Sequence, residues 1–259
     1  MAKNTIKALI LDMDGVIWRD KHPIGDLPKT FNKIESRGIK YVFATNNSTN
    51  TVEKYVELLN QNGIKVHAEQ IFTSATATAK YLLKLHPDGG NIYVVGMNGL
   101  EKTLQNYGFE VSSDDPLAVV AGMDQNLTYE KLKTATLLIR SGVPFIGTNP
   151  DKTFPSPEGL VPGAGSMLAA IQAATDKQPE IIGKPKATMF LQAIETLGEK
   201  PENVLVVGDR LETDIAGGQA ANCKCGLVLT GVSNKAMGDA WRPQIDYIAE
   251  TLDTLIDQV

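Results

Sequence analysis

The chain has 259 residues, of which 42% are hydrophobic and 21% charged, and its formal net charge is −5. This length is enough for a large core and favours two domains of about 100 to 200 residues each. The acidic balance, without any cluster of Lys and Arg, argues against a nucleic-acid partner. The sequence shows no signal peptide and no apolar run of membrane-spanning length, so we expect a soluble, cytoplasmic protein that acts on small molecules.

The stretch from Leu9 to Val16 combines an apolar run of strand length with two carboxylates and a glycine. Asp12 stands where the run ends, and Asp14 follows two residues later. Ligands of open parallel α/β sheets bind outside the carboxyl ends of the strands, so these acids would lie at the mouth of a crevice. Two carboxylates on one short loop repel each other, which a divalent cation or a shared proton would relieve. The alternative is an Asp-rich turn after a buried strand.

Apolar spacing in the next segment predicts a helix over residues 28–37, a strand over residues 39–44 and a second helix beginning near residue 52. Between the strand and the second helix lies the polar run Thr45-Asn46-Asn47-Ser48. A strand, a polar turn and a helix amino terminus together form a site where backbone N–H groups hold an anion. The same run is also typical of a helix-capping loop.

From about residue 80 to residue 180 the pattern of strands and helices begins again. The predicted elements are strands over residues 92–96, 117–122 and 143–147 and helices over residues 99–107 and 128–141. Tyr129 and Ile139 lie on the apolar stripe of the last of these helices. A loop rich in Pro and Gly follows over residues 154–163. This block is typical of a self-contained α/β insert, and it has no second Asp-x-Asp.

The last third of the chain predicts a short strand from Glu180 that ends in Lys184, and then an apolar strand over residues 204–207 that leads to Asp209. A helix from about residue 214 to residue 221 and a strand over residues 226–229 follow. The tail predicts a closing amphipathic helix with apolar residues at Ile248, Leu252, Leu255 and Ile256.

Four predicted strands therefore end in chemically useful groups. These groups are Asp12 with Asp14, Thr45, Lys184 and Asp209. If all four strands are parallel in one sheet, the groups converge at one edge. Carboxylates for a hard cation, a hydroxyl and a lysine for an anion, and a nucleophile are what phosphoryl transfer requires.

Together these motifs resemble those of the haloacid dehalogenase superfamily of phosphohydrolases. The matching stretches are Asp12-Met13-Asp14-Gly15-Val16, Thr45-Asn46-Asn47, Lys184-Pro185 and Gly208-Asp209-Arg210-Leu211-Glu212-Thr213-Asp214. The insert lies between the threonine and lysine motifs, as a class II (subclass A) cap does, and the motifs look like those of the NagD and p-nitrophenyl phosphatase branch. The resemblance implies an α/β fold, with a Rossmann-like parallel-sheet core at residues 1–80 and 181–259 and a smaller α/β cap domain at residues 81–180.

The resemblance also implies catalytic roles for the motif residues. Asp12 would be the nucleophile, and Asp14 the general acid and base. Lys184 would neutralise negative charge in the transition state. The hydroxyl of Thr45 and the backbone N–H of Asn46 would bind the phosphoryl oxygens.

The implied cofactor is Mg2+. The carboxylates of Asp12 and Asp209 and the backbone carbonyl of Asp14 would hold it. Asp214 would orient Lys184 or a metal-bound water, unless it is only a carboxylate at the start of a helix.

We therefore expect a Mg2+-dependent phosphatase of small phosphomonoesters, such as sugar phosphates, nucleotides or phosphoglycolate, and of p-nitrophenyl phosphate in vitro. It would act through an aspartyl-phosphate intermediate. The alternatives are a phosphomutase on the same core and a non-catalytic protein that binds a phosphorylated metabolite. The expected partner is a small phosphorylated metabolite, with no nucleic acid and no membrane, and the resemblance offers a homodimer through the cap as one option.

Other residues leave two interpretations open. Trp18 lies close enough to Asp12 in sequence to contact substrate, but it would equally serve packing. The residues around the Asn-Pro-Asp turn, Thr148, Asn149 and Asp151, either face substrate or only form a turn. The two cysteines, Cys223 and Cys225, are too close together to form a disulfide easily, so we expect reduced core residues.

Overall fold

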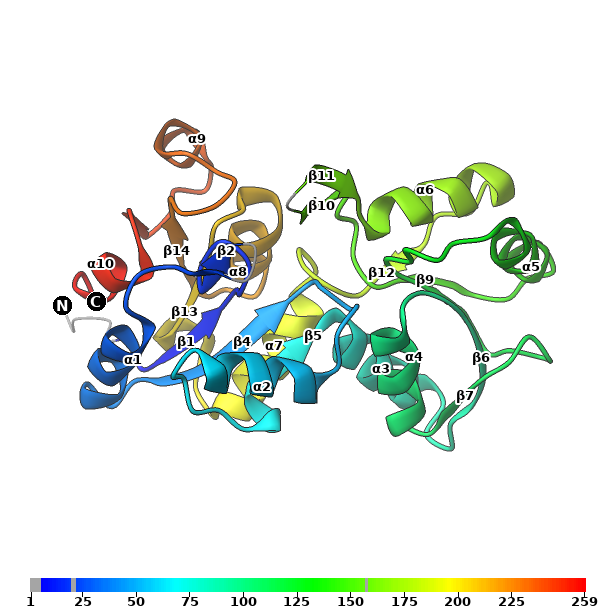
Figure 1. Cartoon of the computed structure of the whole chain (residues 1–259), viewed down its shortest axis with the longest axis horizontal. Coiled ribbons are helices and arrows are strands. Elements are labelled where there is room, and N and C mark those ends of the chain that lie inside the picture. The colour runs from blue at the N-terminus through cyan, green and yellow to red at the C-terminus, as the bar shows by residue number, and fades with distance from the viewer. Residues whose placement is uncertain (1–5, 20–21, 157) are drawn as a thin grey trace. The chain divides into compact units, whose positions relative to one another are not determined.

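A computed structural model of the chain describes residues 6–19, 22–156 and 158–259 (Figure 1). The described residues form two compact units. The first unit draws them from Met1–Thr45, Glu53–Phe72 and Lys184–Val259, and the second from Asn46–Val52 and Thr73–Gly183. The chain therefore leaves the first unit directly after Thr45 and returns to it for the last time at Lys184.

The first unit is built on a six-stranded sheet with the strand order β15-β14-β13-β1-β4-β5. Its strands are β1 (Ala8–Leu11), β4 (Lys40–Thr45), β5 (Ile71–Thr73), β13 (Val204–Gly208), β14 (Lys224–Val228) and β15 (Tyr247–Ala249). β1 runs parallel to both of its neighbours, and Leu11 pairs with Phe43 on β4 and with Val207 on β13. Because these three residues are in register, the residues that follow them emerge at the same edge of the sheet.

All residues of β1 and β13 are buried. Continuous apolar strands of this kind are typical of parallel sheets that are covered on both faces. The helices of this unit are α1 (Leu27–Ser36), α2 (Val52–Gln61), α7 (Ala187–Leu197), α8 (Ala216–Ala220), α9 (Lys235–Ala240) and α10 (Leu252–Ile256). Short helical turns are η1 (Ala68–Gln70), η2 (Pro201–Asn203) and the π-helical η3 (Leu211–Ile215), and β2 (Trp18–Arg19) pairs with β3 (His22–Pro23) in a small hairpin.

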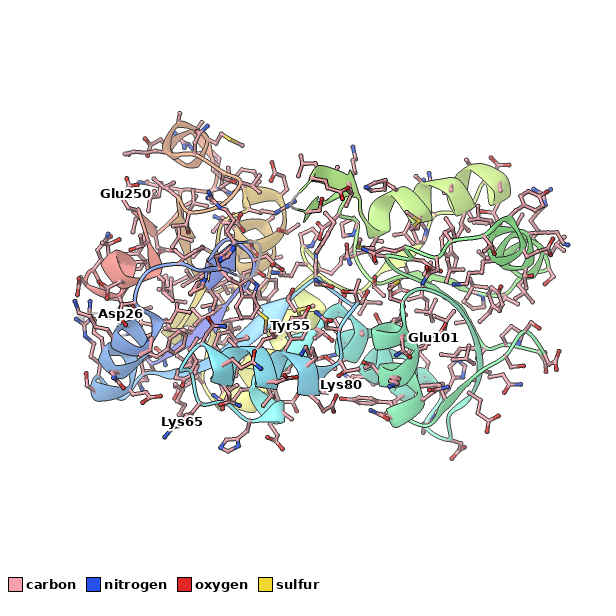
Figure 2. The ribbon with its side chains drawn as sticks, in the orientation of Figure 1. Asp26, Tyr55, Lys65, Lys80, Glu101 and Glu250 are labelled. Carbon is pink, nitrogen blue, oxygen red and sulfur yellow. The ribbon has the colours of Figure 1, made fainter. Side chains whose placement is uncertain are left out.

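Helix α1 shows how local sequence sets an element. The Asp26 carboxylate, labelled in Figure 2, accepts a hydrogen bond from the Lys29 N–H (3.1 Å) and caps the helix start. At the other end, Gly38 has a φ of +69°, a conformation that favours glycine and stops the helix. Lys33 forms ion pairs with Asp253 (2.6 Å) and Asp257 (2.9 Å), which connect α1 to the carboxyl-terminal α10.

The second unit is built on a five-stranded sheet with the order β12-β9-β8-β6-β7, all parallel. Its strands are β6 (Gly90–Val95), β7 (Phe109–Val111), β8 (Val119–Ala121), β9 (Phe145–Gly147) and β12 (Glu180–Ile181). Its helices are α3 (Ser74–Leu85), α4 (Asn98–Asn106), α5 (Tyr129–Arg140) and α6 (Ala164–Thr175). Val95, Val119 and Ile139 belong to its core, so this unit has a hydrophobic core of its own.

The structure corrects one sheet assignment that matters for the site. The strand at Glu180–Ile181 does not join the sheet of the first unit, because β12 pairs with β9 in the second unit. Lys184 comes three residues after this strand and is the first residue back in the first unit. The prediction of four strand ends in one sheet is therefore wrong for Lys184, which enters from a loop.

Three smaller expectations also fail. The Pro- and Gly-rich segment forms a hairpin of β10 (Thr153–Ser156) and β11 (Gly159–Pro162) instead of a loop. Ile248 belongs to strand β15, so the closing helix starts only at Leu252. Tyr129 is 77% exposed because it occupies the first turn of α5, outside the stripe that Ala135 and Ile139 bury.

Within the described residues, no helix has the length and apolar character needed to span a bilayer.

Truncation of the central strands tests this core. Leu205 on β13 is fully buried, so Leu205→Ala should lower the free energy of unfolding by about 2 to 5 kcal/mol through lost burial and the cavity left behind. Leu191→Ala is the matched control, because that leucine is 51% exposed on α7 and should change stability by less than about 0.5 kcal/mol. Urea denaturation of both variants gives the comparison, and equal losses would contradict the assigned core.

Candidate active site

Asp12 follows β1 at the carboxyl edge of the sheet, where its backbone N–H donates to the Val207 carbonyl (2.9 Å). The chain then turns sharply, and Gly15 has a φ of +85°, which disfavours any residue with a Cβ. A Cβ at Gly15 would lie only 2.6 Å from the Asp209 Cγ. The glycine of the Asp-x-Asp-Gly stretch therefore lets the turn pass against Asp209.

Lys184 is 3% exposed and holds three oxygens around its ammonium. Its Nζ donates to Asp12 Oδ1 (2.6 Å), to Asp214 Oδ1 (2.6 Å) and to the carbonyl of Ala44 (3.0 Å). Charge-assisted hydrogen bonds of this length fix the lysine between the two acids. Lys184 therefore joins the site although its own segment does not belong to the sheet.

Asp209 follows β13 and is 2% exposed. Its Oδ2 accepts from the Val232 N–H (2.7 Å), and its carbonyl accepts from the Ser233 N–H (3.0 Å). The loop that supplies these donors passes so close that a Cβ at Gly231 would lie 1.9 Å from Oδ2. The other carboxylate oxygen, Oδ1, is buried and has no hydrogen-bond partner among the residues that the structure describes.

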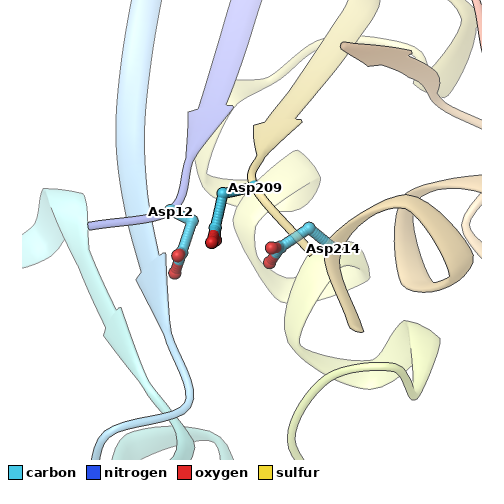
Figure 3. Close-up of side chains that lie close together, drawn as sticks. All are labelled: Asp12, Asp209 and Asp214. Atoms are coloured by element: carbon cyan, nitrogen blue, oxygen red, sulfur yellow. The ribbon is translucent and has the colours of Figure 1, made fainter. Parts of the chain in front are cut away.

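Figure 3 shows Asp12 and Asp209 beyond the ends of neighbouring strands, with Asp214 approaching from the turn that follows β13. One carboxylate oxygen from each lies within 4.8 Å of the others. Asp214 uses one oxygen for Lys184 and the other for the Arg210 N–H (3.2 Å). Asp12 and Asp209 are thus the better cation ligands, and the orphaned Oδ1 is an oxygen of the kind that a hard divalent cation requires.

The ionisation of these groups reflects their burial. Burial raises the pKa of Asp12 well above its ordinary value, the Lys184 ammonium opposes this, and the three neighbouring aspartates add to it. Burial and the charge of Asp214 raise the pKa of Asp209 to about 6, while the Val232 N–H lowers it. Burial alone would lower the pKa of Lys184, but its two acidic partners raise it, so the lysine stays an ammonium.

The polar run after β4 divides between the two units. Thr45 is the buried last residue of β4 in the first unit, and Asn46 is the first residue of the second. Within the second unit, the Asn46 carbonyl accepts from Ser74 Oγ (2.6 Å) and from Asn149 Nδ2 (2.7 Å). The Asn46 side chain donates to Asp151 Oδ2 (3.0 Å). The Asn-Pro-Asp turn thus holds Asn46 in place.

Other sequence-predicted residues have clear positions. Cys223 and Cys225 are free and buried, as expected of core thiols, and burial raises the pKa of Cys223 to about 12. The Trp18 indole is buried, and its Nε1–H donates to Asp14 Oδ1 (3.0 Å). The sequence analysis did not predict that the loop around Gly231 and Val232 contacts Asp209. The available signal was a glycine two residues beyond an apolar predicted strand.

The fold and this site define a class of α/β protein in which aspartates and a buried lysine at a parallel sheet edge are arranged for phosphoryl transfer. Two family models agree, one described as haloacid dehalogenase-like hydrolase over residues 9–110 and one as HAD-hydrolase-like over residues 181–255. The chain is 37% identical over 228 residues to an acid sugar phosphatase of Staphylococcus aureus, a match that covers 88% of each chain. The chain belongs to the haloacid dehalogenase-like hydrolase family.

Solved structures give the same result. The p-nitrophenyl phosphatase of Archaeoglobus fulgidus matches with a TM-score of 0.92 and 30% identity, over 98% of this chain and 100% of that one. NagD of Escherichia coli matches with a TM-score of 0.88 and 29% identity, over 96% of this chain and 98% of the other. The resemblance to the NagD branch, and the α/β core with an inserted cap, are confirmed.

The raised pKa of Asp209 predicts a pH dependence of stability in the metal-free protein. Between its ordinary value of 3.8 and its folded value of about 6, the folded protein keeps a proton that the unfolded chain has lost. Stability should therefore fall as pH rises through this window, by on the order of 3 kcal/mol for this group. Asp209→Asn removes the effect, so in EDTA this variant should gain stability over wild type between about pH 4 and pH 7.

Thermal denaturation across that pH range, in EDTA, measures the difference. The matched control is Asp239→Asn, which removes a carboxylate from an exposed ion pair with Lys235 instead of from the site. A constant stability difference between Asp209→Asn and wild type across the range would contradict the prediction.

Proposed function

We propose that this protein is a Mg2+-dependent phosphatase of small phosphomonoesters that works through an aspartyl-phosphate intermediate. The observation that carries the proposal is the buried Lys184 ammonium between Asp12 and Asp214. Beside it, the Asp209 Oδ1 has no hydrogen-bond partner within the described part of the chain. Family membership supports the hydrolytic reaction. The names of the relatives, acid sugar phosphatase and p-nitrophenyl phosphatase, support phosphomonoesters as the substrate class.

The first step is attack by the Asp12 carboxylate on phosphorus. A bond forms between an Asp12 oxygen and phosphorus while the bond to the leaving oxygen breaks, and Asp14 gives its proton to that leaving oxygen. In the second step, Asp14 takes a proton from water, whose oxygen bonds to phosphorus while the bond between phosphorus and the Asp12 oxygen breaks. Phosphate leaves, and the Asp12 carboxylate is regenerated. Both acids lie on one turn, two residues apart, so one segment supplies nucleophile and proton carrier.

Lys184 balances charge during both steps. Its ammonium already donates to Asp12, so it stands beside the carboxylate that bonds to phosphorus and neutralises the charge that spreads over the phosphoryl group. Asp214 accepts from the same ammonium and fixes its direction. Thr45, through its hydroxyl, and Asn46, through its backbone N–H, complete the proposed phosphate contacts.

The residues present fit a hard divalent cation. The Asp12 and Asp209 carboxylates and the Asp14 carbonyl would hold Mg2+, an ion that prefers such oxygen ligands. When bound, the ion neutralises negative charge so that the Asp12 carboxylate and an anionic phosphate can approach each other. The Val232 N–H holds the other Asp209 oxygen and thereby directs Oδ1 toward this role.

The second unit is proposed as the cap that selects substrates. The boundaries expected from sequence are residues 81–180 for this cap and residues 1–80 and 181–259 for the core. The chain enters it beside the threonine motif and leaves it beside Lys184, so both crossings adjoin proposed phosphate contacts. A cap with its own five-stranded sheet is large enough to exclude macromolecules from a site at the sheet edge. Small metabolites such as sugar phosphates are the proposed substrates.

Release of phosphate from a panel of small phosphomonoesters, including p-nitrophenyl phosphate, tests the function. Activity should require Mg2+, be lost in EDTA, and fall by at least about 1,000-fold in Asp12→Asn, because the amide is not a nucleophile. Asp239→Asn should retain wild-type activity, since that residue is exposed on α9. Turnover by Asp12→Asn at the wild-type rate would refute the assigned nucleophile, and the absence of turnover by the wild type would refute the phosphatase proposal.

Cation binding can be measured without turnover. Mg2+ at about one hundred times its Kd should stabilise the wild type by on the order of 2 to 3 kcal/mol, seen as a rise in melting temperature. Asp209→Asn should lose most of this rise, because its amide cannot supply the charge of the orphaned Oδ1. An undiminished rise in Asp209→Asn would exclude Asp209 as a ligand.

A further inference from the structure

We propose that Trp18 is a positioning residue for Asp14, and that its indole N–H determines which oxygen of that carboxyl group carries the catalytic proton. The inference rests on the proposed phosphatase function and adds a residue to it. Its starting point is the hydrogen bond from Trp18 Nε1–H to Asp14 Oδ1, at 3.0 Å. No motif of the sequence required this contact.

The turn between the two residues is held closed by its own backbone. The Gly15 N–H donates to the Trp18 carbonyl (2.8 Å), and the Ile17 N–H donates to the Met13 carbonyl (2.8 Å). Asp14 and Trp18 also form an isolated β-bridge. The indole and the carboxylate are thus brought together by a short, internally bonded segment, which limits the freedom of both side chains.

The same turn is anchored from outside. Thr230 Oγ1 donates to the Gly15 carbonyl, and the Arg19 guanidinium donates to the Thr230 carbonyl. Trp18 itself is only 6% exposed, so its ring is fixed by burial as well as by the backbone. A donor held this firmly can set the rotamer of the carboxyl group that it contacts.

The chemistry of the pair determines where the proton lies. An indole N–H only donates, so it cannot exchange roles with Asp14 or take up the proton itself. While Asp14 Oδ1 accepts from the indole, the carboxylic acid proton is best placed on Oδ2. Trp18 would therefore present the same oxygen as acid to the leaving group and as base to the attacking water.

A purely structural role for Trp18 predicts something different. Loss of packing would lower the amount of folded protein, and hence the activity on every substrate by the same factor. Loss of a positioned acid would instead slow the reactions that need the proton most. A sugar or other alkyl alcohol leaves poorly without protonation, whereas p-nitrophenolate leaves readily as the anion.

The experiment uses one enzyme preparation and compares its kcat/KM in Mg2+ for two substrates. These are p-nitrophenyl phosphate and the alkyl phosphomonoester that the wild type hydrolyses fastest. Their ratio does not depend on the fraction of folded enzyme. Trp18→Phe keeps a buried aromatic ring and removes the N–H, so the alkyl-to-nitrophenyl ratio should fall by about 10-fold. Trp18→His should recover part of the ratio, because its Nε2 stands as many bonds from Cβ as the indole Nε1.

Two controls separate the outcomes. Trp241→Phe removes the other indole N–H, which donates to Gln219 Oε1 (3.0 Å) away from the motifs, and it should leave the ratio unchanged. In an Asp14→Asn background, Trp18→Phe should cause no further fall, because Trp18 acts through Asp14. An unchanged ratio in Trp18→Phe and Trp18→His, with an active wild type, would overturn the role of Trp18 alone. A wild type inactive on both substrates would overturn the phosphatase function, and with it this inference.

Discussion

The burial of one ammonium among several carboxylates is the constraint on which the site depends. Removing one partner from such a buried cluster leaves an uncompensated charge, at a cost of about 3 to 5 kcal/mol. Lys184 offsets part of the repulsion between Asp12 and Asp214 by donating to both. Burial, together with the negative charge that remains in excess, raises the pKa of Asp209. A cation is therefore the natural further partner of these carboxylates.

Backbone geometry around the cluster is arranged to permit this concentration of charge. The parallel register of β1, β4 and β13 brings three chain segments out at one edge. Glycines then allow the closest approaches, since a Cβ at Gly208 would lie 2.2 Å from the Asp214 Cβ and one at Gly231 would reach Asp209. The Val232 N–H donates to one oxygen of Asp209, and the Trp18 indole donates to one oxygen of Asp14. These hydrogen bonds fix the direction of the second oxygen of each carboxyl group.

The predictions from sequence succeeded where the relevant physics is local. Wholly apolar runs ending in Asp12 and Asp209 indicated buried parallel strands, and the structure contains both as neighbours. The motif of Lys184 correctly predicted that it joins the acidic cluster, but the strand before it was assigned to the wrong sheet. A two-residue strand of moderate polarity does not identify the sheet that it will join. The hairpin at residues 153–162 was missed for a similar reason, since its prolines and glycines favour a loop locally and only cross-strand pairing outweighs this.

Sequence by itself determined the fold class, through the hydrophobic period of short segments. Its motifs also indicated the family and the residues that we propose for the chemistry, because each motif lies within a short segment of chain. Only the tertiary structure decided which carboxylate oxygens of the site accept hydrogen bonds from the protein. Lys184 and Asp12 are 172 residues apart in the chain, and the Val232 and Trp18 donors belong to no motif. Such contacts depend on where long chain segments return in space, and a hydrogen bond is directional over about 3 Å, a precision that periodicity does not encode.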